Sequence, residues 1–177
     1  MPQYVAFLRA INLGAKRKFP KGDIVAATEA AGMSDVATHI NTGNVRLTST
    51  MRSPAKVRAT LERAYAADRG FEVPTVVFTP GELTELTARG VELRAVNEEG
   101  ARHYVQLFHE PPPQAAIDAF AALTAPGEEV IVEGRAAYAL VSSVADAKLL
   151  NTKEFAALGE GTSRTITVLQ AIIAKWC

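Results

Sequence analysis

The sequence has 177 residues, of which 48% are hydrophobic and 21% are charged, and its formal net charge is zero. This composition is typical of a globular protein with one large domain or two small ones. No run of residues approaches the roughly 18 apolar residues of a membrane span, and the single cysteine, Cys177, excludes an internal disulfide. The segment Met1–Tyr4 lacks the charged start and the cleavage site of a signal peptide, so we expect a cytoplasmic protein.

Positive charge is concentrated in the first third of the chain. Residues 1–58 contain nine lysines and arginines and three acidic residues, and the remaining residues carry the balancing negative charge. Such an asymmetry indicates an anionic partner for the first part of the chain. The alternative is that the two parts have differently solvated surfaces without any ligand.

The first half of the sequence shows the pattern of one α+β unit. The apolar run Tyr4–Leu8 predicts a buried strand, and Pro20 predicts the first turn of a helix. Two further strands, Val36–Asn41 and Val45–Ser49, are predicted to form a hairpin around a turn that contains Gly43.

The hairpin register that follows from a two-residue turn places Thr38 opposite Leu47. His39 and Arg46 then lie on the other face, because side chains alternate along a strand. This arrangement would put a cation-rich pair on one side of the hairpin.

A second helix, a fourth strand and a third helix complete the first half. Pro54 begins the second helix, and Pro74–Phe78 forms the strand. Thr79 and Glu82 form a capping box for a short helix that ends near Ala88. The order β-α-β-β-α-β, followed by one helix, is the split βαβ arrangement of ferredoxin-like domains.

The second half repeats this pattern after a polar connection at residues 91–102. The strand His103–His109 is predicted first, and a helix follows Pro113. A hairpin over Val130–Ser142 comes next. Two helices close the half, one ending near Leu158 and one over Ile166–Trp176. The predicted fold class is therefore α+β, with two ferredoxin-like βαββα(β) halves in tandem. Their predicted boundaries are residues 1–90 and residues 101–177.

The loop between the first strand and the first helix is the leading candidate for a binding site. A helix N-terminus offers unpaired N–H groups and a partial positive charge, and both favour a phosphate group. The loop matches neither G-x-x-x-x-G-K-[ST] nor G-x-G-x-x-G, and a solvated basic loop is the alternative. The candidate anion-binding residues in this loop are Arg9, Asn12, Gly14, Lys16, Arg17 and Lys18.

The hairpin and the last glycine-bearing loop are candidate neighbours of the basic loop. Their candidate anion-binding residues are Thr42, Gly43, Asn44, Arg46 and Arg164. Asn and Gly are also the residues that a tight turn needs. For the loop at residues 159–164, N-capping of the last helix by Thr162 or Ser163 is the alternative.

The sequence predicts no metal site and no cofactor. His103 and His109 lie six residues apart on one predicted strand, roughly 20 Å from each other, which is too far to share an ion. No H-E-x-x-H, C-x-x-C or G-x-S-x-G motif is present, so no catalytic residue is identified.

The segment Tyr4–Gly14, followed by Lys16 and Lys18 and then by Thr42–Val45, resembles the bacterial family called domain of unknown function 1697 (DUF1697). Members of this family are similar to a duplicated ferredoxin-like α+β arrangement, so the resemblance implies the same fold as the pattern of elements. The family typically carries a Thr-Arg-Asn-Trp-Asn-Thr-like stretch before its last helix. Here Arg164 matches that stretch, but its Asn and Trp positions do not match. The family has no established activity, and the resemblance implies no chemistry.

Three functions remain open at this point. The first is the binding of an anionic ligand, either a phosphorylated small molecule or a nucleic acid, at the basic loop. The second is a small enzyme that acts on a phosphorylated metabolite, with the same cations as electrostatic stabilisers. The third is a protein-interaction domain without a ligand. We rank binding first because no acid–base pair is visible, and the scarcity of aromatic residues near the basic loop argues against base stacking.

Overall fold

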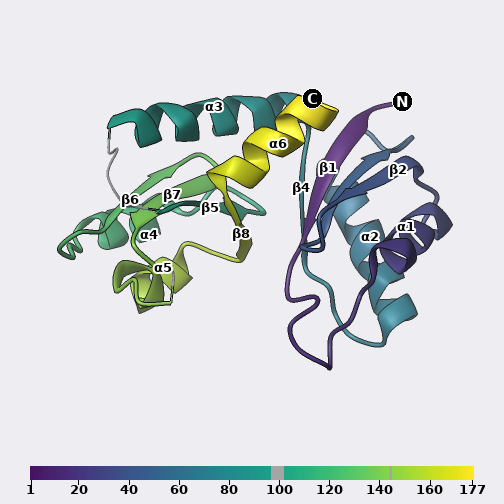
Figure 1. Ribbon diagram of the computed structural model, residues 1–177, viewed down its shortest axis with the longest axis horizontal. Helices are drawn as coiled ribbons and strands as arrows, with labels where there is room; N and C mark the ends of the chain where they lie inside the picture. Colours follow the sequence, from purple (N-terminus) through teal and green to yellow (C-terminus); the bar gives the residue numbers. More distant parts are fainter. Residues whose placement is uncertain (97–101, 144) are drawn as a thin grey trace. The chain divides into compact units, whose positions relative to one another are not determined.

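The computed structural model describes residues 1–96, 102–143 and 145–177. The chain divides into two compact units, of which unit 1 comprises Met1–Leu83 with Lys175–Cys177 and unit 2 comprises Thr84–Ala174. Each unit is built around a four-stranded antiparallel sheet (Figure 1). The predicted α+β class with two tandem ferredoxin-like halves is therefore confirmed.

Unit 1 contains the first six elements of the chain in the predicted order. They are β1 (Gln3–Leu8), α1 (Lys21–Ala30), β2 (Ser34–His39), β3 (Asn44–Thr48), α2 (Pro54–Arg69) and β4 (Thr75–Phe78). The strand order in the sheet is β2-β3-β1-β4, with β1 antiparallel to both of its neighbours. This order places β1 in the middle of the sheet, which explains why its sequence is a continuous apolar run.

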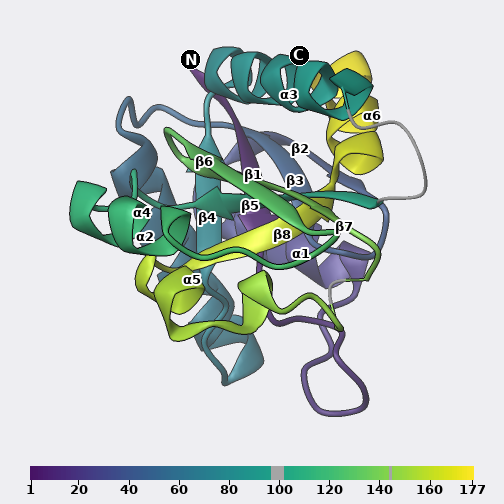
Figure 2. The same ribbon diagram turned by 90° about the vertical axis from the view of Figure 1, so that its left-hand side faces the viewer.

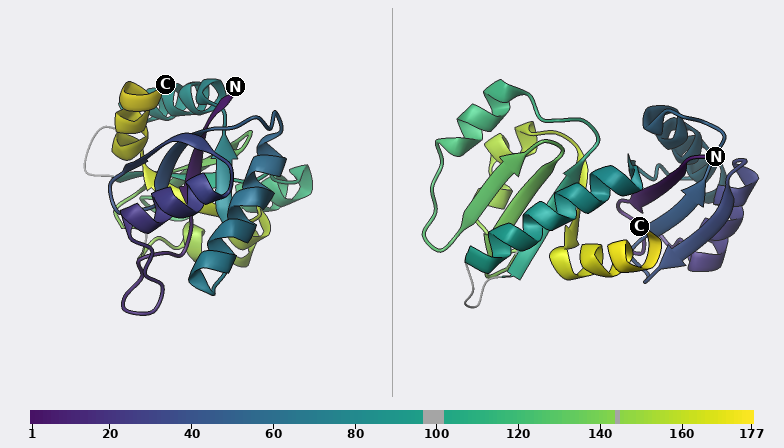
Figure 3. Two further views of the ribbon diagram at one scale, coloured as in Figure 1. Left: turned by 90° about the vertical axis from the view of Figure 1, so that its right-hand side faces the viewer. Right: turned by 90° about the horizontal axis from the view of Figure 1, so that it is seen from above.

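Helices α1 and α2 lie side by side on one face of this sheet (Figure 3, left). The core beneath them contains Tyr4, Ala6 and Leu8 from β1, which are at most 1% exposed. The ring of Phe19 packs edge-on against the ring of Tyr65 at 5.3 Å between centroids. Burial of a large apolar side chain contributes about 1.5–3 kcal/mol to the unfolding free energy, so the buried ring of Phe19 holds the chain in place just before α1.

The last residues of the chain return to unit 1. The side-chain amide of Gln3 donates a 2.9 Å hydrogen bond to the backbone carbonyl of Trp176. The Trp176 ring lies edge-on to the ring of His39, with 6.1 Å between the centroids. The end of the final helix is thus fixed to the first two strands of the sheet.

Unit 2 repeats the strand order of unit 1. The elements from the third helix onward are α3 (Pro80–Val96), β5 (Arg102–Phe108), α4 (Gln114–Ala121), β6 (Glu129–Glu133), β7 (Ala136–Val141), the 3₁₀ turn η1 (Leu149–Asn151), α5 (Lys153–Ala157), β8 (Gly161–Thr165) and α6 (Ile166–Trp176). The sheet order is β6-β7-β5-β8, in which the first strand of the unit is again central. Among the described residues, no helix is long and apolar enough to cross a membrane.

Both faces of the unit 2 sheet are covered by helices. Figure 1 shows α3 and α6 over one face, and Figure 2 shows α4 and α5 against the other. On the α3 side, the Tyr138 hydroxyl donates a 3.0 Å hydrogen bond to the carbonyl of Leu86. On the opposite side, the rings of Phe120 and Phe155 pack 5.6 Å apart. Three layers therefore enclose the central strand of this unit.

The predicted end of the third helix near Ala88 is wrong, because α3 continues to Val96. Gly90, a residue type that often ends a helix, lies inside α3 and allows close packing instead. A Cβ atom at Gly90 would lie 2.7 Å from the Ile166 side chain and 3.2 Å from the Tyr138 ring. Residues 91–96 of the connection predicted at residues 91–102 are therefore helix, and residues 97–101 lie outside the described residues.

The predicted register of the first hairpin is also wrong. Thr38 pairs with Val45 instead of Leu47, because the turn contains four residues instead of two. The shift is even, so His39 and Arg46 still share one face of the hairpin, as predicted.

The glycine-bearing loop predicted at residues 159–164 is largely a strand. Residues Gly161–Thr165 form β8, which pairs with β5 along an edge of the sheet. The N-terminus of α6 is accordingly capped by Thr165, whose hydroxyl accepts a 3.3 Å hydrogen bond from Val168 N–H, and not by Thr162 or Ser163. The sequence of β8 is polar and shows no alternation of apolar and polar residues, so the strand could not be predicted from it.

Candidate functional site

The basic loop and the first hairpin turn meet at the start of α1. They enclose an open pocket of about 640 Å³, which we call the α1 pocket. Its lining residues are Asn12, Gly14, Lys18, Pro20, Lys21 and Asn41. Three of the eleven residues predicted to bind an anion, Asn12, Gly14 and Lys18, are therefore brought together here.

Asn12 holds the pocket in shape. Its side-chain amide donates to the carbonyls of Phe19, at 3.2 Å, and Asn41, at 3.0 Å. Its side-chain oxygen accepts from Phe19 N–H at 2.9 Å, and its own backbone N–H donates to the carbonyl of Arg17. One side chain thus closes the basic loop and ties it to the hairpin turn.

Gly43 brings the hairpin turn against the end of β1. Its φ is +74°, and a Cβ atom there would lie 2.7 Å from Leu8 Cβ and 2.8 Å from the Ile11 side chain. Its carbonyl accepts a 2.7 Å hydrogen bond from Leu8 N–H. Only glycine allows this approach, so the residue supports the pocket without touching it.

Backbone strain is concentrated in the same two loops. Four non-glycine residues of the described chain have positive φ, and three of them are Ala10, Asn12 and Ile40. Left-handed backbone costs an alanine or a β-branched residue about 1–2 kcal/mol, and strain of this kind clusters at functional sites. Tertiary contacts thus hold these two loops in backbone conformations that the residues would not favour by themselves.

Arg17 is a structural residue of the loop. Its guanidinium donates hydrogen bonds to the carbonyls of Ala10 and Glu72. The same group lies over the ring of Phe71, 4.6 Å from the ring centroid. These contacts engage the guanidinium group that was predicted from the sequence to bind an anion.

The other cations of this region are exposed. Arg9, Lys16, Lys18 and Lys21 make no ion pair with any residue that the structure describes. Lys18 and Lys21 line the α1 pocket, whereas Arg9 and Lys16 lie elsewhere on the loop. Among the described residues, no acidic partner therefore neutralises the positive charge of either lining lysine.

The N-terminus of α1 adds to this field. The capping residue, Pro20, has no side chain that can accept a hydrogen bond from the first turn. The acid of that turn, Asp23, is paired with Arg69 at 2.9 Å. The first N–H groups of α1 thus lack a side-chain cap, and Pro20 and Lys21 bring this partially positive end of the helix to the pocket wall.

The remaining predicted residues of the hairpin hold the hairpin itself. Asn44 is fully buried, and its amide donates 3.0 Å hydrogen bonds to the carbonyl of His39 and the hydroxyl of Thr42. The side chain of Arg46 donates to the carbonyl of Asp35 at 3.3 Å. Neither Asn44 nor Arg46 lines the pocket.

Arg164 lies in unit 2, on β8. Its guanidinium donates to the hydroxyl of Thr162, at 2.9 Å, and to the carbonyl of Ser163, at 2.8 Å. Burial lowers the pKa of Arg164 to about 10, so the side chain remains charged at neutral pH. It belongs to a different unit from the α1 pocket.

Three lining residues of the α1 pocket were not among the predicted ligands: Pro20, Lys21 and Asn41. Lys21 had a usable signal, because it is basic and directly follows the proline that begins the helix. Asn41 reaches the pocket through the four-residue turn, which the predicted register did not contain. Across the described parts of the chain, no three His, Cys, Asp or Glu side chains come together to hold a metal ion.

The chain was compared with known proteins. No curated protein sequence matches it. A solved structure, that of the conserved bacterial protein SP0830 from Streptococcus pneumoniae, is similar with a TM-score of 0.77 and 19% sequence identity. The match covers 98% of this chain and 97% of the other, and at this identity it shows a shared fold.

A family profile matches most of the sequence. Residues 1–138 match the family described as protein of unknown function (DUF1697). The matched range contains every lining residue of the α1 pocket, whereas Arg164 lies beyond it. The chain belongs to the DUF1697 family.

Proposed function

We propose that the protein binds a small phosphate-bearing ligand in the α1 pocket. The observation that carries this proposal is the set of groups around the pocket, which are cations and hydrogen-bond donors without a carboxylate among them. Lys18 and Lys21 supply charge, and the uncapped first turn of α1 supplies N–H groups. A phosphate is the ligand group whose charge and acceptor oxygens complement this set.

The expected affinity follows from these contacts. A helix N-terminus contributes about 0.3–1 kcal/mol toward an anion, and each hydrogen bond to a charged group contributes about 1.5–3 kcal/mol. A phosphate held by α1 and by one hydrogen bond from each lysine would gain about 3–7 kcal/mol, which corresponds to a Kd between about 5 mM and 10 μM.

A small ligand is favoured over a nucleic acid. None of the aromatic side chains in the described ranges is exposed, and the rings nearest the pocket, such as Phe19, are buried. Proteins that bind single strands usually stack bases on exposed rings. The α1 pocket instead offers a local charge cluster of the size of one or two phosphate groups.

The proposal is for binding and not for a reaction. The six lining residues include no imidazole and no carboxylate that would move a proton during catalysis. A protein-interaction surface would not need an uncapped helix N-terminus flanked by two lysines that form no ion pair with a described residue.

The test is a calorimetric titration with phosphorylated metabolites and nucleotides, against the dephosphorylated form of each compound. We expect binding of at least one phosphorylated compound, and a loss of about tenfold or more in affinity in the double variant Lys18→Gln/Lys21→Gln. Lys56→Gln is the matched control, because Lys56 is exposed at the start of α2 and lies outside the pocket lining. Equal binding by the double variant and the control would refute the proposal.

A further inference from the structure

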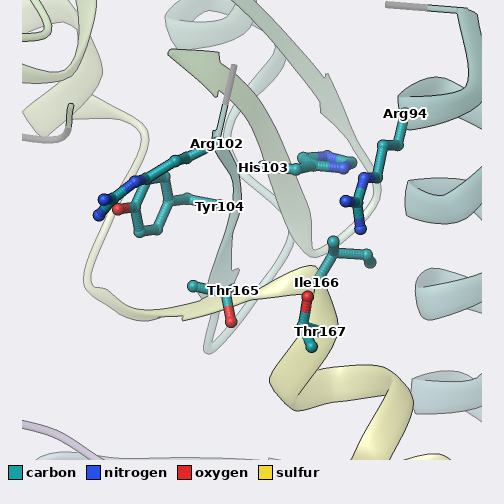
Figure 4. A pocket seen from close by; sticks show the side chains of 7 residues that line it. All are labelled: Arg94, Arg102, His103, Tyr104, Thr165, Ile166 and Thr167. Carbon is teal, nitrogen blue, oxygen red and sulfur yellow. The ribbon is translucent and has the colours of Figure 1, made fainter. Parts of the chain in front are cut away.

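A second donor-rich pocket lies in unit 2, where β8 ends and α6 begins. This pocket, which we call the α6 pocket, has a volume of about 310 Å³. Figure 4 shows that its walls come from three elements: α3, the start of β5, and the junction of β8 with α6. Its lining residues include Arg94, His103 and Thr167.

His103 is the unusual residue of this pocket. It is only 4% exposed, yet neither ring nitrogen has a hydrogen-bond partner among the described residues. One side of the ring packs against Tyr138, 6.2 Å away between centroids, and the other lies toward Arg94 (Figure 4). A buried imidazole is normally paired, so these two nitrogens indicate that a partner occupies the pocket.

The surrounding groups define the chemistry of that partner. Arg94 extends from α3 toward the first turn of α6, and it makes no ion pair with a described residue (Figure 4). Helix α6 contains no acidic residue, and its exposed Thr167 adds a hydroxyl to the first-turn N–H groups. Burial, and secondarily the charge of Arg94, lowers the pKa of His103, so the ring is neutral at neutral pH. One of its nitrogens then donates a hydrogen bond and the other accepts one.

We propose that the α6 pocket is a second binding site, which takes the phosphate group of a small ligand. The guanidinium of Arg94, the N-terminus of α6 and the imidazole of His103 approach from three different elements. This spread of directions suits a tetrahedral anion better than a planar carboxylate, which a single arginine binds side by side. The nitrogen of neutral His103 that carries no proton accepts a hydrogen bond from a singly protonated phosphate.

Arg102 also borders the pocket but has a different role. It extends beside the ring of Tyr104, away from His103 (Figure 4). Neighbouring residues of a strand point to opposite faces, so Arg102 and His103 cannot both contact one phosphate. The site is therefore assigned to the α3 side of the sheet.

The test is a titration of isotopically labelled full-length protein with inorganic phosphate, followed by NMR at constant ionic strength. The imidazole signals of His103 and the amide of Thr167 report on the α6 pocket, and the amide of Gly22 reports on the α1 pocket. We expect the His103 and Thr167 signals to shift and saturate with phosphate, and to move less with acetate. They should keep this response in Lys18→Gln/Lys21→Gln, so failure of one pocket is distinguishable from failure of the other.

Two variants at the α6 pocket complete the experiment. Arg94→Gln should weaken phosphate binding at the Thr167 reporter about tenfold, whereas Arg63→Gln, an exposed change on α2, should not alter it. His103→Phe keeps the buried ring and should leave the fold intact while weakening phosphate binding to a similar extent. The proposal fails if the Thr167 signal does not respond to phosphate, or if it responds equally in Arg94→Gln and Arg63→Gln.

Discussion

The two units have the same strand order but differ in which helix begins at an open, positively charged pocket. In unit 1 the helix after the first strand, α1, begins beside Lys18 and Lys21. In unit 2 the corresponding connection, residues 109–113, is short, contains Glu110 and three prolines, and carries no lysine or arginine. The connection after the first strand thus carries cations and hydrogen-bond donors in unit 1, whereas in unit 2 it carries no lysine or arginine.

The helices that follow the fourth strands show the reverse difference. The N-terminus of α3 is closed by a capping box, in which the Glu82 carboxylate accepts from the backbone N–H of Thr79 at 2.9 Å and from its hydroxyl at 2.7 Å. The N-terminus of α6 has only the hydroxyl of Thr165 and no acid in its first turn. A carboxylate at a helix start already occupies the place where an anionic ligand would bind. Topology therefore provides several helix starts, and local side chains decide which of them can accept a ligand.

The largest expected effect concerns the hairpin glycines of the two units. Gly43→Ala places a methyl group against Leu8 and Ile11 at positive φ, and should lower the unfolding free energy by roughly 2–4 kcal/mol. Gly134→Ala has the same backbone strain but open space around it, and should cost about 1 kcal/mol. Urea unfolding followed by circular dichroism measures both. Equal losses would show that the approach of the hairpin turn to β1 does not contribute to stability.

A smaller effect on stability distinguishes the structural cation of the basic loop, Arg17, from the proposed ligand-binding cation, Lys18. Arg17→Gln removes two hydrogen bonds to backbone carbonyls and the contact with Phe71, and should cost about 1–3 kcal/mol of unfolding free energy. Lys18→Gln changes an exposed side chain and should leave stability within about 0.5 kcal/mol. Thermal unfolding of the two variants checks this ranking. A stability loss for Lys18→Gln as large as that for Arg17→Gln would make Lys18 structural and weaken the case for the α1 pocket.

The sequence predicted the fold well because the signals that specify it are local. The apolar run of β1, the proline before α1 and the capping box at Thr79 each act within a few residues. It also placed Asn12, Gly14 and Lys18 near one helix start, because loop and helix are adjacent in the chain.

What the sequence did not show depends on contacts between distant residues. The role of Arg17 is set by carbonyls at Ala10 and Glu72, the latter 55 residues away. Strand β8 is polar and forms because β5 offers it an edge. The α6 pocket was not found because Arg94 was assigned to a connection, and because His103 becomes unusual only through its burial.

The smallest predicted effect is a pH dependence that belongs to unit 2. The pKa of His103 in the folded protein is lower than its ordinary value of about 6.5, first through burial and second through the charge of Arg94. As the pH falls below about 6.5, the unfolded chain takes up a proton that the folded chain does not, so the unfolding free energy decreases. This decrease does not occur above that pH, where the ring is neutral in both states, and it is absent in His103→Phe.

The measurement is urea unfolding of the two proteins between pH 7.5 and pH 5.5 in phosphate-free buffer. Carboxylates titrate alike in both proteins, so the difference between their unfolding free energies isolates His103. It should change by less than about 1.4 kcal/mol per pH unit, the limit for one proton. Because the negative charge of a phosphate in the α6 pocket favours protonation of His103 as the pH falls, added phosphate should reduce the pH-dependent difference between the two proteins. A difference that stays constant with pH would mean that His103 titrates normally, and that its ring nitrogens are not shielded from water.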